Sequence, residues 1–193
     1  MNYKIAKTML GLCIGYLSVF YILKFFFPQI LVQIISHPTL IRLGEFIGIW
    51  IGFEYIVMSI TLFITYYLFA CASSGRFKFS WKFHLILLGL VIISHLFAEL
   101  LPDLYTHTSI SIMLIIALLS KGKLLYTVIS FVLHGYLTQF LLAIRGFETI
   151  MLNFTPVSGI LINLEVDVWL CLLAIIFHLK EKHKNGKICT PLC

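Results

Sequence analysis

Four acidic residues interrupt long apolar stretches of this chain, where ionisable side chains are uncommon. They are Glu54, Glu99, Glu165 and Asp167, half of the eight acids in the sequence. Removing a carboxylate from water without a partner is costly, so each is expected to meet a hydrogen-bond donor, a cation or water. Together they predict a polar site inside an apolar framework.

Three of these acids have an aromatic ring, an imidazole or an amide four residues before them. The pairs are Trp50 with Glu54, His95 with Glu99, and Asn163 with Asp167. Residues four apart lie on one face of an α-helix. Carboxylates supply charge for a cation, and an indole ring can stack on an organic cation. The spacing therefore predicts a binding site for a polar or cationic solute.

Glu165 and Asp167 are two residues apart, so on a helix they point about 160° away from each other. At most one of them is expected to enter a shared site, and Asp167, on the same face as Asn163, is favoured. His134 is expected near the floor of this site. The predicted substrate-binding set consists of Trp50, Glu54, His95, Glu99, His134, Asn163 and Asp167.

Two other functions are compatible with these residues. His95 and Glu99 could ligate a divalent metal ion with a further carboxylate, or act as the acid–base pair of an intramembrane hydrolase or isomerase on lipid or peptide. The sequence lacks three common motifs: the zinc-peptidase motif H-E-x-x-H, the serine-hydrolase motif G-x-S-x-G and the nucleotide-binding motif G-x-x-x-x-G-K-[ST]. No cofactor is identified. The other alternative is a non-catalytic subunit of a membrane complex, whose buried polar residues serve interfaces.

The elements that must position these residues are long apolar segments. The chain has 193 residues, of which 61% are hydrophobic and 11% are charged, whereas a soluble domain carries about 25% charged residues. A helix that crosses a bilayer needs about 20 apolar residues. Six segments qualify, at 8–27, 46–72, 83–102, 104–120, 124–144 and 157–179. The predicted fold is all-α, a single domain formed by a bundle of six transmembrane helices.

The positive charges favour one orientation of this bundle. If the N-terminus is inside, 11 of the 14 Lys and Arg residues fall on the inner side. The inner residues are Lys4, Lys7, Arg76, Lys78, Lys82, Lys121, Lys123, Lys180, Lys182, Lys184 and Lys187, and the outer ones are Lys24, Arg42 and Arg145. This bias predicts an N-in, C-in protein of a bacterial-type plasma membrane. The net charge of +6 then indicates contact with anionic lipid and not with nucleic acid.

Two features between and within the segments need their own explanation. Pro28 and His37-Pro38 enclose an apolar piece too short to cross a bilayer, so residues 28–40 are expected to form an interfacial or re-entrant segment. Gly11 and Gly15 would make one helix face flat, which predicts a close helix contact inside the bundle or with a partner. Residues 180–193 are expected to form a basic cytosolic tail.

In architecture, this arrangement resembles the substrate-binding membrane subunits of energy-coupling-factor vitamin importers. The resemblance lies in the six spans, the loop at 28–45, the acidic cluster, and Gly11 with Gly15. It implies that a solute binds in the outer half under that loop, and that the small residues of the first helix meet an energising subunit. The leading functional prediction is therefore solute binding and uptake.

Overall fold

The computed structural model describes the backbone of residues 3–27, 53–100, 105–143 and 156–188, with 29–30, 33, 37–39 and 42 between the first two ranges. Within these ranges it does not describe the side chains of 53–58, 98–99, 105–107, 136–143, 156–163 and 185–188. Most of the predicted interfacial segment at 28–40 lies outside the described residues.

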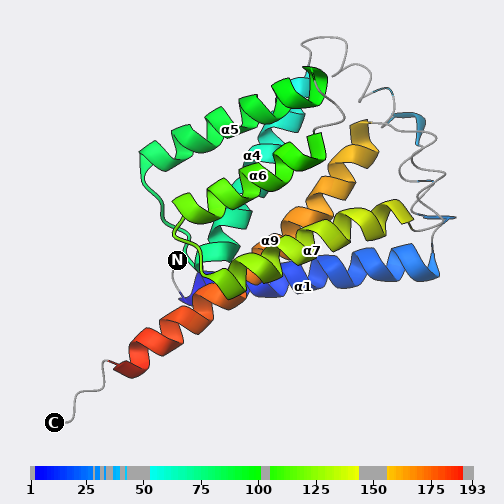
Figure 1. Ribbon diagram of the computed structural model, residues 1–193. Coiled ribbons are helices and arrows are strands. Elements are labelled where there is room, and N and C mark those ends of the chain that lie inside the picture. Colours follow the sequence, from blue (N-terminus) through cyan, green and yellow to red (C-terminus); the bar gives the residue numbers. More distant parts are fainter. Residues whose placement is uncertain are drawn as a thin grey trace.

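The described part of the chain is all-helical, which confirms the prediction of an all-α fold. Its helices are α1 (Tyr3–Phe26), α4 (Phe53–Ser74), α5 (Trp81–Leu100), α6 (Tyr105–Leu119), α7 (Leu124–Ala143) and α9 (Pro156–Ile188). Each lies on one of the six predicted apolar segments. Helix α9 runs on into the predicted basic tail, and Figure 1 shows its C-terminal part projecting beyond the other helices.

Glycines set the ends of two helices. Gly75 ends α4 in a left-handed conformation (φ 67°), and its amide donates to the carbonyl of Cys71 over 2.8 Å. After α6 the Gly122 amide donates to the Ala117 carbonyl over 2.7 Å. A Cβ atom on Gly122 would lie 2.9 Å from that same carbonyl oxygen and 2.8 Å from Thr127 Oγ1. The turn from α6 to α7 therefore requires a glycine at this position.

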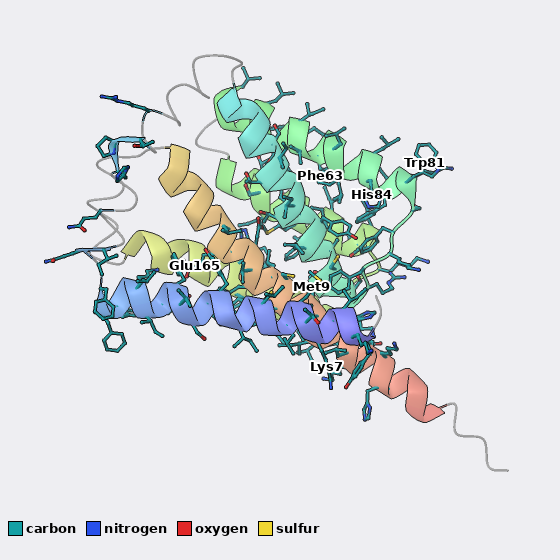
Figure 2. The ribbon with its side chains drawn as sticks, turned by 180° about the vertical axis from the view of Figure 1, so that it is seen from behind. Lys7, Met9, Phe63, Trp81, His84 and Glu165 are labelled. Atoms are coloured by element: carbon teal, nitrogen blue, oxygen red, sulfur yellow. The ribbon has the colours of Figure 1, made fainter. Side chains whose placement is uncertain are left out.

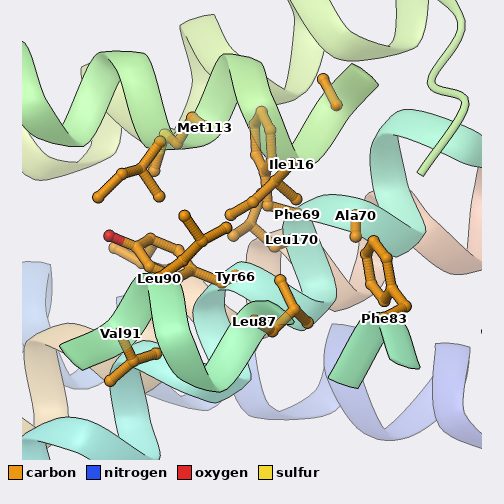
Figure 3. Packing of buried hydrophobic residues seen from close by; sticks show 13 residues of the cluster. Tyr66, Phe69, Ala70, Phe83, Leu87, Leu90, Val91, Met113, Ile116 and Leu170 are labelled. Atoms are coloured by element: carbon orange, nitrogen blue, oxygen red, sulfur yellow. The ribbon is translucent and has the colours of Figure 1, made fainter. Parts of the chain in front are cut away.

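The main hydrophobic core surrounds α4, which contacts α5, α6, α7 and α9. Tyr66 and Phe69 of α4 pack with Leu87 of α5, Ile116 of α6 and Leu170 of α9, all at most 1% exposed (Figure 3). Buried positions three and four residues apart along α4 form the stripe that turns toward these neighbours. Helix α4 is thus the central element against which the polar residues of other helices are positioned.

The helix ends that carry most of the cations gather at one end of the bundle. Figure 1 shows the start of α1 there, together with the turns after α4 and α6 and the point where α9 leaves the bundle. We call this the basic end (residues 75–82, 120–124 and 178–184). Its parts are bonded to one another, since the Lys123 amide donates to the Ser73 carbonyl over 2.8 Å and the Arg76 guanidinium donates to the Ser120 carbonyl.

Large apolar side chains are exposed on the outside of the molecule and also fill its core. Among the most exposed are Leu124 (83%), Leu118 (78%) and Leu12 (69%). Helix α1 is the one described helix that is long and apolar enough to cross a membrane, and only 22% of its most apolar 18-residue window is buried. Shorter apolar helical stretches are Ser59–Ser74, Trp81–Phe97, Thr108–Leu119 and Leu124–Gly135.

The glycine pair of α1 does not serve packing within the described bundle. A Cβ atom built on Gly11 or Gly15 would meet no atom within 4 Å. Close helix contact inside the bundle, one of the two predicted uses of this pair, is therefore not seen among the described residues. The other use, contact with a partner helix, is compatible with this open face.

Candidate functional site

Asp167 is buried between α9 and α4. Its Oδ1 atom lies 2.6 Å from Thr65 Oγ1, which also lies 3.0 Å from the Thr61 carbonyl. A hydroxyl has one hydrogen, so Thr65 donates to one of these two acceptors at a time. In the part of the chain that the structure describes, no lysine or arginine pairs with Asp167. Within the described ranges, this carboxyl group is therefore bonded to a hydroxyl and has no cationic partner.

Glu165, two residues earlier on α9, faces α1 and is fully buried (Figure 2). The Tyr21 hydroxyl donates to its Oε1 atom over 2.6 Å, and Lys24 Nζ lies 3.6 Å from its Oε2 atom. The Trp169 indole N–H donates to the Tyr21 oxygen over 3.1 Å. Two residues of α1 and two of α9 thus form an interhelical polar network around an ion pair.

The two neighbouring acids therefore reach different helices and have different electrostatic surroundings. Lys24 is one of the three cations predicted on the outer side, and the sequence analysis did not foresee that it is 7% exposed and paired with Glu165. Its position inside the apolar segment 8–27 was a usable signal, since a lysine within a span needs a partner.

His95 lies at the contact of α5 with α4. Its Nε2 atom is 3.0 Å from Ser59 Oγ, and both residues are half-buried. One residue earlier, Ser94 Oγ lies 2.8 Å from the Tyr66 hydroxyl, in a fully buried position. Sequence reasoning paired His95 with Glu99 and missed Ser59, which is 36 residues away along the chain.

Asp167 and His95 approach α4 from different directions. Their partners Thr65 and Ser59 are six residues apart, which separates them by about 120° around the helix and about 9 Å along it. For the other predicted site residues the structure gives no side-chain contact with Asp167 or His95. His134 is half-buried on α7, Glu54, Glu99 and Asn163 are described only as helical backbone, and Trp50 lies outside the described residues. A single site formed by all seven remains a prediction.

Metal ligation receives no support from the side chains that are described. Among them, no group of three or more His, Cys, Asp or Glu residues could hold a metal ion. The predicted pair of His95 and Glu99 is not tested by this result, because the Glu99 side chain lies outside the description.

The basic end contains one acid, Glu181 of α9, which is bonded to the turn before α7 and to α7 itself. Glu181 forms an ion pair with Lys123 and accepts a hydrogen bond from the Tyr126 hydroxyl over 2.9 Å. The hydrogen bond from Lys123 is the main reason that the pKa of the Glu181 carboxyl lies below its ordinary value. The Tyr126 ring stacks on Phe177 at 3.9 Å, so the ion pair is attached to a packed contact.

Comparison of the chain with protein-family models, with curated proteins and with solved structures found no match.

Proposed function

We propose that this chain is a multi-pass integral membrane protein with six transmembrane helices and both termini on the cytosolic side of a bacterial-type plasma membrane. Three observations support the proposal. Large apolar side chains are exposed on its helices, where a soluble monomer rarely exposes more than small apolar patches. The α1 helix is long enough to cross a bilayer, and both the start of α1 and the C-terminal part of α9 lie at the basic end (Figure 1).

We further propose that it binds and takes up a polar or cationic solute, and that Asp167 is the carboxylate that binds the solute or a coupled cation. The observation that carries this proposal is the burial of Asp167 against Thr65, without a lysine or arginine partner among the described residues. In an apolar bundle such a carboxylate is stabilised when a proton or a cation binds to it. Glu165 has no such need, because Lys24 already balances its charge.

Uptake needs a source of energy, and the chain has no nucleotide-binding motif. We propose that the energy comes from an ion gradient or from a partner subunit. The open face around Gly11 and Gly15 supports a partner, since small residues let another helix approach closely.

Ligand-dependent thermal unfolding of the purified protein tests the uptake proposal. Sodium, potassium, choline, spermidine and thiamine serve as probes, each added to wild type, Asp167→Asn and a control, Ser130→Ala. Ser130 is a suitable control because its hydroxyl bonds to the Tyr126 carbonyl of its own helix. At least one probe is expected to raise the unfolding temperature of wild type and Ser130→Ala, and to bind Asp167→Asn at least tenfold more weakly.

Two results would contradict the assignment of Asp167. One is an equal response of Asp167→Asn to every probe that stabilises wild type. The other is the absence of any response together with native mass spectra of the purified protein that contain neither a bound solute nor a bound cation.

A further inference from the structure

Ser59 of α4 and His95 of α5 form a pair with the geometry of a nucleophile and its base. The distance of 3.0 Å between Ser59 Oγ and His95 Nε2 is one at which an imidazole can take the proton of an attacking hydroxyl. The two residues come from different helices, so only the packing of α4 against α5 brings them together.

Ser59 differs from several other hydroxyl residues within the helices. Serine and threonine within helices commonly bond to the carbonyl four residues earlier. Thr65, Ser74 and Ser130 do so here, bonding to the carbonyls of Thr61, Ala70 and Tyr126 respectively. Within the described residues, the Ser59 hydroxyl is instead bonded to the His95 imidazole. Its hydroxyl hydrogen is thus available to a base.

The pair is accessible from the apolar outside of the bundle. Ser59 and His95 are half-buried, and they are flanked by Ile60, Ile92 and Leu96, which are 55%, 54% and 50% exposed. The neighbouring pair of Tyr66 and Ser94 is at most 1% exposed, which fits a purely structural bond. A substrate with an apolar chain could therefore approach Ser59 from between lipid molecules but could not reach Ser94.

We propose that Ser59 and His95 are the nucleophile and the general base of an acyl-transfer site for carboxylic esters carried on apolar chains. Ser59 Oγ attacks the ester carbonyl carbon while His95 Nε2 takes the hydroxyl proton. The tetrahedral intermediate collapses, the alcohol leaves with the proton from the imidazolium, and an acyl-serine remains. Water then attacks the acyl-serine and gives a proton to Nε2, and Ser59 recovers its proton as the carboxylic acid departs.

This reaction requires a neutral imidazole that carries its hydrogen on Nδ1. The site lies on the α5 side of α4, whereas Asp167 reaches α4 from α9. It therefore does not depend on the proposed solute site.

A fluorophosphonate carrying an alkyl chain and a fluorescent reporter tests the proposal on the full-length protein in lipid nanodiscs. Attack by Ser59 Oγ on phosphorus would expel fluoride and leave a stable phosphonyl-serine. Wild type is expected to become labelled, with the modified peptide located at Ser59 by mass spectrometry. Ser59→Ala should abolish labelling, and His95→Gln should slow it at least 100-fold.

The matched control is Ser94→Ala, which removes the buried serine next to His95 and should leave labelling unchanged. Size-exclusion chromatography of each variant identifies any that fail to fold. The labelling site in wild type tests the proposal even without the variants. Absence of label on Ser59 in folded wild-type protein overturns the proposal. Label on Ser59 that forms as fast in His95→Gln also overturns it. Neither result bears on cation binding at Asp167, so the two proposals fail separately.

Discussion

Lys24 Nζ lies 3.6 Å from Glu165 Oε2, with both side chains almost completely buried, and this ion pair joins the first helix of the chain to the last. Two charges removed from water are costly even when paired, and much more costly when one of them is left alone. The pair therefore makes the docking of α1 on α9 dependent on both residues being present.

The first prediction concerns this mutual dependence. Glu165→Gln and Lys24→Met are each expected to destabilise the protein by about 3–5 kcal/mol, because each leaves one buried charge without its partner. The double variant removes both charges and should be close to wild type. Unfolding by denaturant in detergent micelles measures all four proteins as a double-mutant cycle. A loss of stability in the double variant equal to the sum of the two single losses would show that the pair is not coupled.

The second prediction contrasts Asp167 with Glu165. Asp167→Asn should fold with stability equal to or above that of wild type, because it removes a buried charge that no described lysine or arginine balances. The amide oxygen can still accept the hydrogen bond from Thr65. The measurement is thermal unfolding of wild type, Asp167→Asn and Glu165→Gln in the absence of added ligand. A loss of several kcal/mol in Asp167→Asn would mean that an undescribed cation pairs with this carboxylate.

The third prediction is a pH dependence at the basic end. The pKa of the Glu181 carboxyl is below its ordinary value of 4.5 in the folded protein, so the unfolded chain binds its proton more readily. The stabilisation of the folded protein by the Glu181 carboxylate is therefore fully present above pH 4.5, and it is lost as the pH falls through the pKa of this group in the folded protein. Because Lys123 is exposed, the effect should stay below about 1 kcal/mol.

Thermal unfolding of wild type and Glu181→Gln between pH 7 and pH 3 checks this effect. The difference between the two proteins should be largest at neutral pH, should shrink on acidification, and should be weaker at 1 M salt. A difference that grows as the pH falls would contradict the assigned sign.

The fourth prediction uses two glycines in opposite surroundings. Gly122→Ala would place a Cβ atom 2.9 Å from the Ala117 carbonyl oxygen, and it is expected to destabilise the protein by about 1–3 kcal/mol through overpacking. Gly11→Ala meets no atom within 4 Å and should stabilise α1 by about 0.5–1 kcal/mol. Both are measured by thermal unfolding of the purified chain. Equal effects of the two substitutions would argue against the tight turn at Gly122.

The fifth prediction tests the proposed membrane orientation. Single cysteines in place of Lys121 and Lys182 should react with a membrane-impermeant maleimide only after cells are opened, whereas one in place of Gly146 should react in intact cells. The background is a variant without Cys189 and Cys193, since Cys13 and Cys71 are buried and Cys171 is half-buried. Reaction of the cysteine at position 121 in intact cells would overturn the N-in, C-in orientation.

The sequence alone was enough for the helices and for the local geometry within them. Continuous apolar segments separated by polar breaks predict where helices run, because an apolar chain segment satisfies its backbone hydrogen bonds internally as a helix. The rotation of 100° per residue places Glu165 and Asp167 on different faces. The short Lys121-Gly122-Lys123 stretch likewise predicts the tight turn between α6 and α7.

The partners of the polar residues were decided only by the tertiary structure. Glu165 is bonded to Tyr21, Asp167 to Thr65, and His95 to Ser59, at sequence separations of 144, 102 and 36 residues. Such pairs depend on how each helix is rotated about its axis and on which helices are neighbours. In these helices apolar residues occur on every side, so no amphipathic stripe in the sequence indicates which face turns inward. Packing of α5 on α4 brings Ser59 to His95, and packing of α1 on α9 brings Lys24 to Glu165.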